Sequence, residues 1–89
     1  MTKKEVGKEV GKVTHYFSRI SVAGVRLTDR LRVGDRIHIL GHTSDFEQDV
    51  TSMELDRQPI EVGEPGQEIG LLVAERVRRG DTVYKVEEE

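Results

Sequence analysis

Two histidines and an aspartate lie close together in the stretch LRVGDRIHILGHTSDF. His38, His42 and Asp45 are residue types that bind metal ions or transfer protons near neutral pH. A paired-histidine metal site uses ligands four residues apart on a rigid helix, whereas Gly41 interrupts a run that alternates here like a strand. Zinc would need a further protein ligand, and His15 is distant in the sequence. The spacing therefore favours a loop between strands over a metal site.

Serines are the remaining candidates for nucleophilic chemistry, because the chain contains no cysteine. A nucleophilic serine needs a nearby imidazole and a third group that orients it. His42 lies two residues from Ser44, but no G-x-S-x-G turn surrounds that serine, and the same requirement applies to Ser18. We therefore expect no catalytic residue, no cofactor and no bound metal. Ser44 or Asp45 is expected to bond to neighbouring backbone amides of the loop.

Short strands must position these residues, because apolar and polar residues alternate with a period of two. In KVTHYFS this alternation places Val13, His15 and Phe17 on the inward face and the intervening residues, Tyr16 among them, outward. The pattern recurs twice further along the chain, and the inward residues there are Ala23, Val25, Leu27, Ile37 and Ile39.

Turn residues separate these runs. Pro65-Gly66 predicts a type II turn, and Gly34-Asp35 and Gly80-Asp81 each precede a strand. The alternation changes phase between Val50 and Met53, which predicts a bulge. Two further strands are expected at 69–74 and 82–86, although EIGLLVAERVRR also fits a helical stripe.

The 89 residues predict one domain of the all-β class. We expect a small closed or nearly closed antiparallel Greek-key barrel of six to seven strands over residues 11–86. Residues 1–10 are expected to be a flexible charged arm, and residues 87–89 an acidic tail. The sequence shows neither a signal peptide nor an apolar run of membrane-spanning length, so a cytoplasmic protein without membrane contact is expected. Dense charge without cysteine also hints at a thermophilic source.

Charge is unevenly distributed along the chain, although the net charge is only −3. Residues 1–44 carry nine Lys and Arg against four acids, whereas residues 45–89 carry five against thirteen. Such a split indicates a partner that meets one half of the molecule, and a polyanion is one candidate for the basic half. A thermostable surface of mixed charges would explain the same counts.

The basic half suggests a site for RNA. Guanidinium groups bind phosphate bidentately and stack on bases, and an outward Tyr16 would stack on an unpaired base. The alternative is an ion network in which the arginines pair with Asp29, Asp35 and the acidic segment 45–56. The predicted nucleic-acid-binding residues are Lys12, Tyr16, Arg19, Arg26, Arg30, Arg32 and Arg36.

The order of these motifs resembles a known family. Four stretches together resemble the second domain of translational GTPases such as elongation factor Tu. They are VGKVTHYFSRISVAGVRL, LRVGDRIHILG, VTSMELDRQPIEVGEPGQEIGLLV and RRGDTVYKV. The matching residues are Gly11, Val13, Val33, Gly34, Asp35, Gly41, Val50, Ser52, Met53, Gly66, Gly70, Gly80 and Asp81. Through VGKVTHYF, GHTSDF and ERVRRGDTVYKV the chain looks closer to the C-terminal barrel of the collagenase-like peptidase family. Members of that family include proteins needed for hydroxylation of transfer or ribosomal RNA.

The resemblance implies a free-standing accessory barrel that binds and does not catalyse. The chain has no G-x-x-x-x-G-K-[ST] loop for nucleotide phosphates and no TIM-barrel partner domain. The expected function is a translation elongation factor-like module that binds structured RNA, either tRNA or rRNA, or a ribosome-associated protein. The alternative is a protein–protein adaptor that uses the acidic 45–56 face or a strand edge, for example as an accessory to a collagenase-like peptidase or RNA-hydroxylation protein. A monomer or weak dimer is expected.

Overall fold

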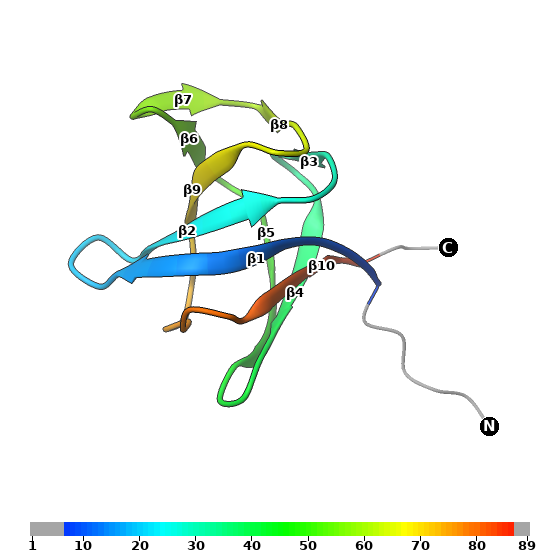
Figure 1. Ribbon diagram of the computed structural model, residues 1–89, viewed down its shortest axis with the longest axis vertical. Helices are drawn as coiled ribbons and strands as arrows, with labels where there is room; N and C mark the ends of the chain where they lie inside the picture. Colours follow the sequence, from blue (N-terminus) through cyan, green and yellow to red (C-terminus); the bar gives the residue numbers. More distant parts are fainter. Residues whose placement is uncertain (1–6, 87–89) are drawn as a thin grey trace.

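The structure is a computed structural model that describes residues 7–86. Within this range the chain forms β-strands and no helix, which confirms the all-β class (Figure 1). None of the described residues forms the long apolar helix that crossing a membrane would require. The strands are β1 (Lys8–Phe17), β2 (Val22–Leu27), β3 (Leu31–Arg32), β4 (Arg36–Leu40), β5 (Asp45–Asp49), β6 (Met53–Leu55), β7 (Gln58–Ile60), β8 (Val62–Gly63), β9 (Glu68–Leu72) and β10 (Thr82–Lys85).

Eight of the strands form one antiparallel sheet, in the order β5-β4-β10-β1-β2-β9-β6-β7. The other two, β3 and β8, pair with each other. The strands are arranged around the interior and do not lie in one flat layer (Figure 1). Backbone pairing does not join the outer strands β5 and β7, so the sheet is open. A closed Greek-key barrel is therefore not confirmed, and the described residues form ten strands where six to seven were expected.

The two predicted terminal segments, residues 1–10 and 87–89, lie partly or wholly outside the described range. Strand β1 begins at Lys8, so the last residues of the expected N-terminal arm belong to the sheet. Residues 1–6 of that arm, and the expected acidic tail at 87–89, lie outside the described residues.

The core is built from the inward residues of the alternating runs. The predicted inward residues of β2 and β4 are buried, as period-two alternation requires. Buried apolar residues from β1, β6, β9 and β10 join them, and so do residues between strands such as Val50 and Val77. The predicted strands near 69–74 and 82–86 are present as β9 and β10, so EIGLL is a strand and not a helix.

A bulge in β1 reverses the expected orientation of its second half. The register with β2 shifts between Val13 and His15, which makes Thr14 an extra residue. One extra residue turns every following side chain to the opposite face. Tyr16 therefore packs against the core, whereas His15 and Phe17 are exposed. The prediction that His15 and Phe17 point inward and Tyr16 outward is wrong for this reason.

The predicted turn at Pro65-Gly66 is present, but the predicted bulge between Val50 and Met53 is not. Gly66 has a φ of 91°, and the Gln67 amide donates to the Glu64 carbonyl at 3.2 Å. The alternation of apolar and polar residues changes phase after Val50 because residues 50–52 lie between two strands. Strand β5 ends before Val50, and β6 begins at Met53.

The two Gly-Asp pairs form turns of the same construction, at Arg32–Asp35 and Arg78–Asp81. In each turn the aspartate amide donates to the arginine carbonyl at 3.0 Å, and the arginine amide donates to the aspartate carboxylate at 2.9 Å. Gly34 and Gly80 have φ values of 102° and 96°, the left-handed conformation that the third position of a type II turn requires. Glycine adopts this conformation without a steric cost.

Each Gly-Asp turn is bound to a valine by the same pair of backbone hydrogen bonds. The glycine amide donates to the valine carbonyl, the valine amide donates to the aspartate carbonyl, and all four distances are 2.8 Å. The valine is Val50 for the first turn and Val13 for the second. Because the turns begin β4 and β10, which pair antiparallel, they lie at opposite ends of one ladder. The fold thus contains one turn-and-two-strand unit twice, as β4 with β5 and as β10 with β1.

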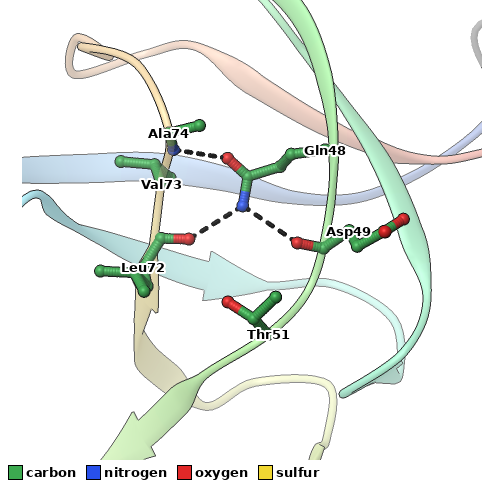
Figure 2. A pocket seen from close by; sticks show the side chains of 6 residues that line it. All are labelled: Gln48, Asp49, Thr51, Leu72, Val73 and Ala74. Atoms are coloured by element: carbon green, nitrogen blue, oxygen red, sulfur yellow. Dashed lines mark hydrogen bonds between the residues drawn. The ribbon is translucent and has the colours of Figure 1, made fainter.

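The side chain of Gln48 joins β5 to the segment that follows β9 (Figure 2). Its amide nitrogen donates to the Leu72 carbonyl at 2.9 Å and to the Asp49 carbonyl at 3.2 Å. Its amide oxygen accepts from the Ala74 amide at 2.7 Å. A pocket of about 290 Å³ adjoins these groups. Because the polar groups beside this pocket already bond to one another, we assign the Gln48 side chain a structural role.

Replacement of Gln48 should therefore weaken the fold. Gln48→Ala removes the bonds that connect β5 to Leu72 and Ala74, and each such bond contributes about 0.5–1.5 kcal/mol. We expect the free energy of unfolding to fall by about 1–2 kcal/mol in urea titrations. Gln58→Ala, which changes an exposed glutamine on the outer strand β7, is the control. Equal losses in both variants would contradict this role for Gln48.

Candidate interaction surface

His38 is held by carboxylates of the adjacent strand. It is 7% exposed on β4, with Nε2 at 2.6 Å from Asp45 and Nδ1 at 3.7 Å from Glu47. His42 lies on the exposed loop between β4 and β5. Among residues 7–86 no group of three or more His, Cys, Asp or Glu side chains is arranged to hold a metal ion. The structure thus brings His38 and Asp45 together as a cross-strand contact within one hairpin.

Ser44 bonds to a distant carboxylate and not to neighbouring backbone amides as predicted. Its hydroxyl donates to Asp81 at 2.5 Å, and both residues are buried. The same carboxylate oxygen accepts from the Arg78 amide, which fixes its position. Gly41 faces the other carboxylate oxygen so closely that a Cβ there would lie 1.9 Å from it. The loop therefore depends on a glycine at 41, and its serine is already committed to a structural bond.

A side chain at position 41 should be poorly tolerated. In Gly41→Ala the added Cβ would overlap a carboxylate that Ser44 and the Arg78 amide hold in place. We expect a loss of about 2–3 kcal/mol in the free energy of unfolding, the upper range for overpacking. Gly70→Ala is the matched control, because its Cβ would lie 3.3 Å from its nearest neighbour, a methyl group of Val22. The explanation fails if both variants lose the same stability in urea titrations.

Two of the predicted RNA-binding arginines form ion pairs within the protein. Arg36 contacts Asp49 at 2.9 Å and Glu47 at 3.2 Å. Its hydrogen bond to Asp49, followed by that to Glu47, raises the pKa of Arg36 above its usual value. Arg30 contacts Glu64 at 3.2 Å. Glu47 and Asp49 belong to the acidic segment 45–56 that the ion-network alternative named, whereas Glu64 lies outside it.

The other predicted basic residues are distributed over several elements. Lys12 and Arg26 are brought together as cross-strand neighbours on β1 and β2, and the Lys12 ammonium donates to Thr82 at 3.1 Å. Arg19 lies on the β1–β2 loop and Arg32 on β3. No ion pair between described residues involves Arg19, Arg26 or Arg32.

Tyr16 makes contacts within the protein. Its ring packs against the core, and the Arg76 guanidinium lies 6.0 Å from the ring centroid. This is the geometry of a cation–π contact. RNA binding by the seven-residue set remains a prediction.

Sequence patterning did not reveal an apolar patch on the outer face of the sheet, at the end that carries the β1–β2 hairpin. Phe17 is 47% exposed, Ile20 62% and Leu72 40%, and Val22 is half-buried. Phe17 pairs across strands with Val22, and Val22 pairs with Leu72, so their side chains share one face. We call these four residues the outer patch. The hairpin extends beyond the neighbouring strands in Figure 1. One signal in the sequence was His15, a polar residue at an expected core position.

A groove of about 370 Å³ adjoins the outer patch. Phe17, Ile20 and Val22 provide its apolar lining, and Gly70 leaves space on β9. The remaining lining residues are charged, namely Glu54, Asp56, Arg57 and Glu68. We call this the outer groove. Its combination of an apolar lining and several carboxylates distinguishes it from the basic surface that was predicted.

Comparisons with known proteins identify peptidase-like relatives. The chain is 35% identical over 81 residues to an uncharacterized protease of Methanocaldococcus jannaschii, which covers 90% of the chain and 20% of that protein. It is 37% identical over 78 residues to a collagenase of Porphyromonas gingivalis, which covers 85% of the chain and 22% of that protein. The chain thus spans about a fifth of the length of these curated relatives. No protein-family model matches the chain.

A solved structure has the same fold. It is the crystal structure of the C-terminal domain of a Geobacillus thermoleovorans protein named "putative U32 peptidase", with a TM-score of 0.84 and 18% identity. The match covers 97% of this chain and all of that domain. The comparisons therefore show similarity to the C-terminal domain of U32 collagenase-like peptidases. They do not confirm the resemblance to the second domain of translational GTPases.

Proposed function

We propose that this chain is a non-catalytic protein-docking domain that serves a U32 peptidase-like protein. The observation that carries the proposal is the outer patch, an apolar surface exposed on a strand end and a projecting hairpin. Isolated apolar side chains are common on protein surfaces, whereas contiguous groups of them mark interaction sites. Here Phe17, Val22 and Leu72 are consecutive neighbours across three strands, and Ile20 extends the group onto the loop.

The similarity to peptidases supports an accessory role. The relatives are named protease and collagenase, and about four fifths of their length lies outside the matched region. In this chain the candidate groups for chemistry are bound to one another, His38 to Asp45 and Ser44 to Asp81. We assign the chemistry of such proteins to the parts that this chain does not match, and binding to the part that it does.

RNA binding is the second candidate, and one observation favours it. Lys12 and Arg26 are adjacent on β1 and β2, which places two cations side by side. Arg30 and Arg36, in contrast, already contact three carboxylates, and a phosphate would have to displace them. A translation factor-like or ribosome-associated module would use this surface and not the outer patch. The two candidates therefore predict different sensitive residues.

A paired experiment distinguishes these functions. The chain is immobilised, proteins are captured from nuclease-treated extract of its source organism, and the dissociation constant of each specific partner is measured by calorimetry. In the Phe17→Ser/Ile20→Ser variant we expect binding to weaken about tenfold or more, since burial of each half-exposed side chain contributes about 1 kcal/mol. Val62→Ser, a 38% exposed valine on β8, is the matched control.

The RNA alternative is tested with labelled tRNA and rRNA fragments at two salt concentrations. Phosphate contacts weaken steeply as salt rises. If the chain is a docking domain, the Lys12→Ala/Arg26→Ala variant should not abolish any RNA binding that the unmodified chain shows. Salt-sensitive binding that this variant removes, together with protein capture unaffected by Phe17→Ser/Ile20→Ser, would overturn the docking function in favour of RNA.

A further inference from the structure

The outer groove lies between two hairpins and has an open centre. Phe17 and Ile20 belong to the β1–β2 hairpin, and Glu54 and Asp56 to the hairpin of β6 and β7. Between them Gly70 of β9 carries no side chain, and a Cβ there would lie 3.3 Å from a methyl group of Val22 and 4.0 Å from the Glu54 Cβ. The groove thus passes directly over the β9 backbone, between the apolar side chains of the outer patch and the Glu54 carboxylate.

The charged groups at the groove are predominantly acidic. Glu54 and Asp56 are exposed, and their carboxylates make no hydrogen bond or ion pair with another described residue. Glu68 accepts a hydrogen bond from the Thr14 hydroxyl at 2.6 Å and makes no ion pair with another described residue, although Arg26 is its cross-strand neighbour. Arg57 is the one cation among the groove's lining residues. Three carboxylates against one guanidinium give the groove a net negative charge.

We propose that the outer groove binds a lysine or arginine side chain from a basic, apolar segment of the docked protein. The inference rests on the proposed docking function and specifies the chemistry of the partner. Long cationic side chains place their methylene stems on apolar surface and their charged heads at polar groups. The stem would lie along Val22 and Gly70 beside the Phe17 ring, and the head would meet Glu54 or Glu68. A ring near the cation adds a cation–π attraction.

The same charges oppose an anionic ligand in this groove. Carboxylates at a surface repel phosphates at short range and attract basic partners. Apolar side chains on the same face of the segment as the basic residue would cover the outer patch, because Leu72, Val22 and Phe17 form a row beside the groove. The partner segment is therefore expected to be extended, with apolar residues two positions away from the basic residue, where their side chains share its face.

The probe is an acetylated and amidated pentapeptide, Leu-Ala-Lys-Ala-Leu, added to the isotope-labelled chain and followed by amide NMR shifts. The comparison peptide carries norleucine in place of the lysine, which keeps the stem and removes the charge. We expect the largest shifts at the amides of Val22, Glu54 and Gly70. The norleucine peptide should bind about fivefold more weakly, since it lacks the ion pair and the cation–π contact.

Charge variants of the chain test the role of each carboxylate. Glu54→Gln and Glu68→Gln should each weaken binding of the lysine peptide about two- to fivefold without changing the affinity for the norleucine peptide. Glu61→Gln is the matched control, because Glu61 is an exposed acid outside the groove. Arg57→Gly should strengthen lysine binding about twofold, because it removes the opposing charge. Arg57 has a φ of 65°, so glycine should also relieve strain there and raise the melting temperature.

The outcomes separate this inference from the docking function. Equal affinity for both peptides, or lysine binding that is unchanged in both Gln variants, would overturn the basic-side-chain assignment while docking through the outer patch stands. The opposite result is that peptide binding depends on charge but no captured protein loses affinity in the Phe17→Ser/Ile20→Ser variant. That result would support the groove as a site for basic side chains and overturn the docking function. A uridine oligonucleotide that shifts the same amides, more strongly after Glu54→Gln, would also contradict the proposal.

Discussion

The fold depends on two Gly-Asp turns that fix opposite ends of the ladder between β4 and β10. Each aspartate carboxylate accepts a hydrogen bond from the arginine amide of its own turn, and each turn binds a valine, Val50 or Val13, through two backbone hydrogen bonds. The second turn has an added constraint, because the Asp81 carboxylate is buried and must be satisfied by the Ser44 hydroxyl. This bond anchors the β4–β5 loop to β10, and it requires a glycine at 41. A local turn motif thereby determines how segments 37 residues apart pack together.

The same anchoring explains why the outer patch is exposed. Val13 is held against the second turn, and the register of β1 shifts immediately after it. The bulge at Thr14 turns Phe17 out of the core and Tyr16 into it. Beyond the bulge β1 pairs with β2, and the hairpin extends past the neighbouring strands (Figure 1). The apolar surface is thus a consequence of the bulge, since uninterrupted alternation would have turned Phe17 inward.

Features set by neighbouring residues were predictable from the sequence, and features set by distant contacts were not. Alternation identified the buried side of β2 and β4, and Pro65-Gly66 identified a turn, because each depends on a few adjacent residues. The bulge in β1 depends on pairing with other strands, and alternation assumes that no residue is extra. The bond from Ser44 to Asp81 joins positions with no pattern between them. Likewise, the outer groove combines residues from four strands and two loops, so no single stretch of sequence predicts it.

The charge asymmetry of the sequence has a different meaning in three dimensions. The basic and acidic halves suggested two surfaces of opposite sign, but antiparallel pairing of β4 and β5 sets Arg36 directly opposite Asp49. Contacts between Arg30 and Glu64 and between Lys85 and Asp35 join the halves in the same way. Exposed pairs of this kind contribute little to stability, yet they reduce the field that a distant polyanion would meet. The carboxylates of the outer groove lie beside apolar side chains and outside this pairing, so their charge is available to a partner that buries both together.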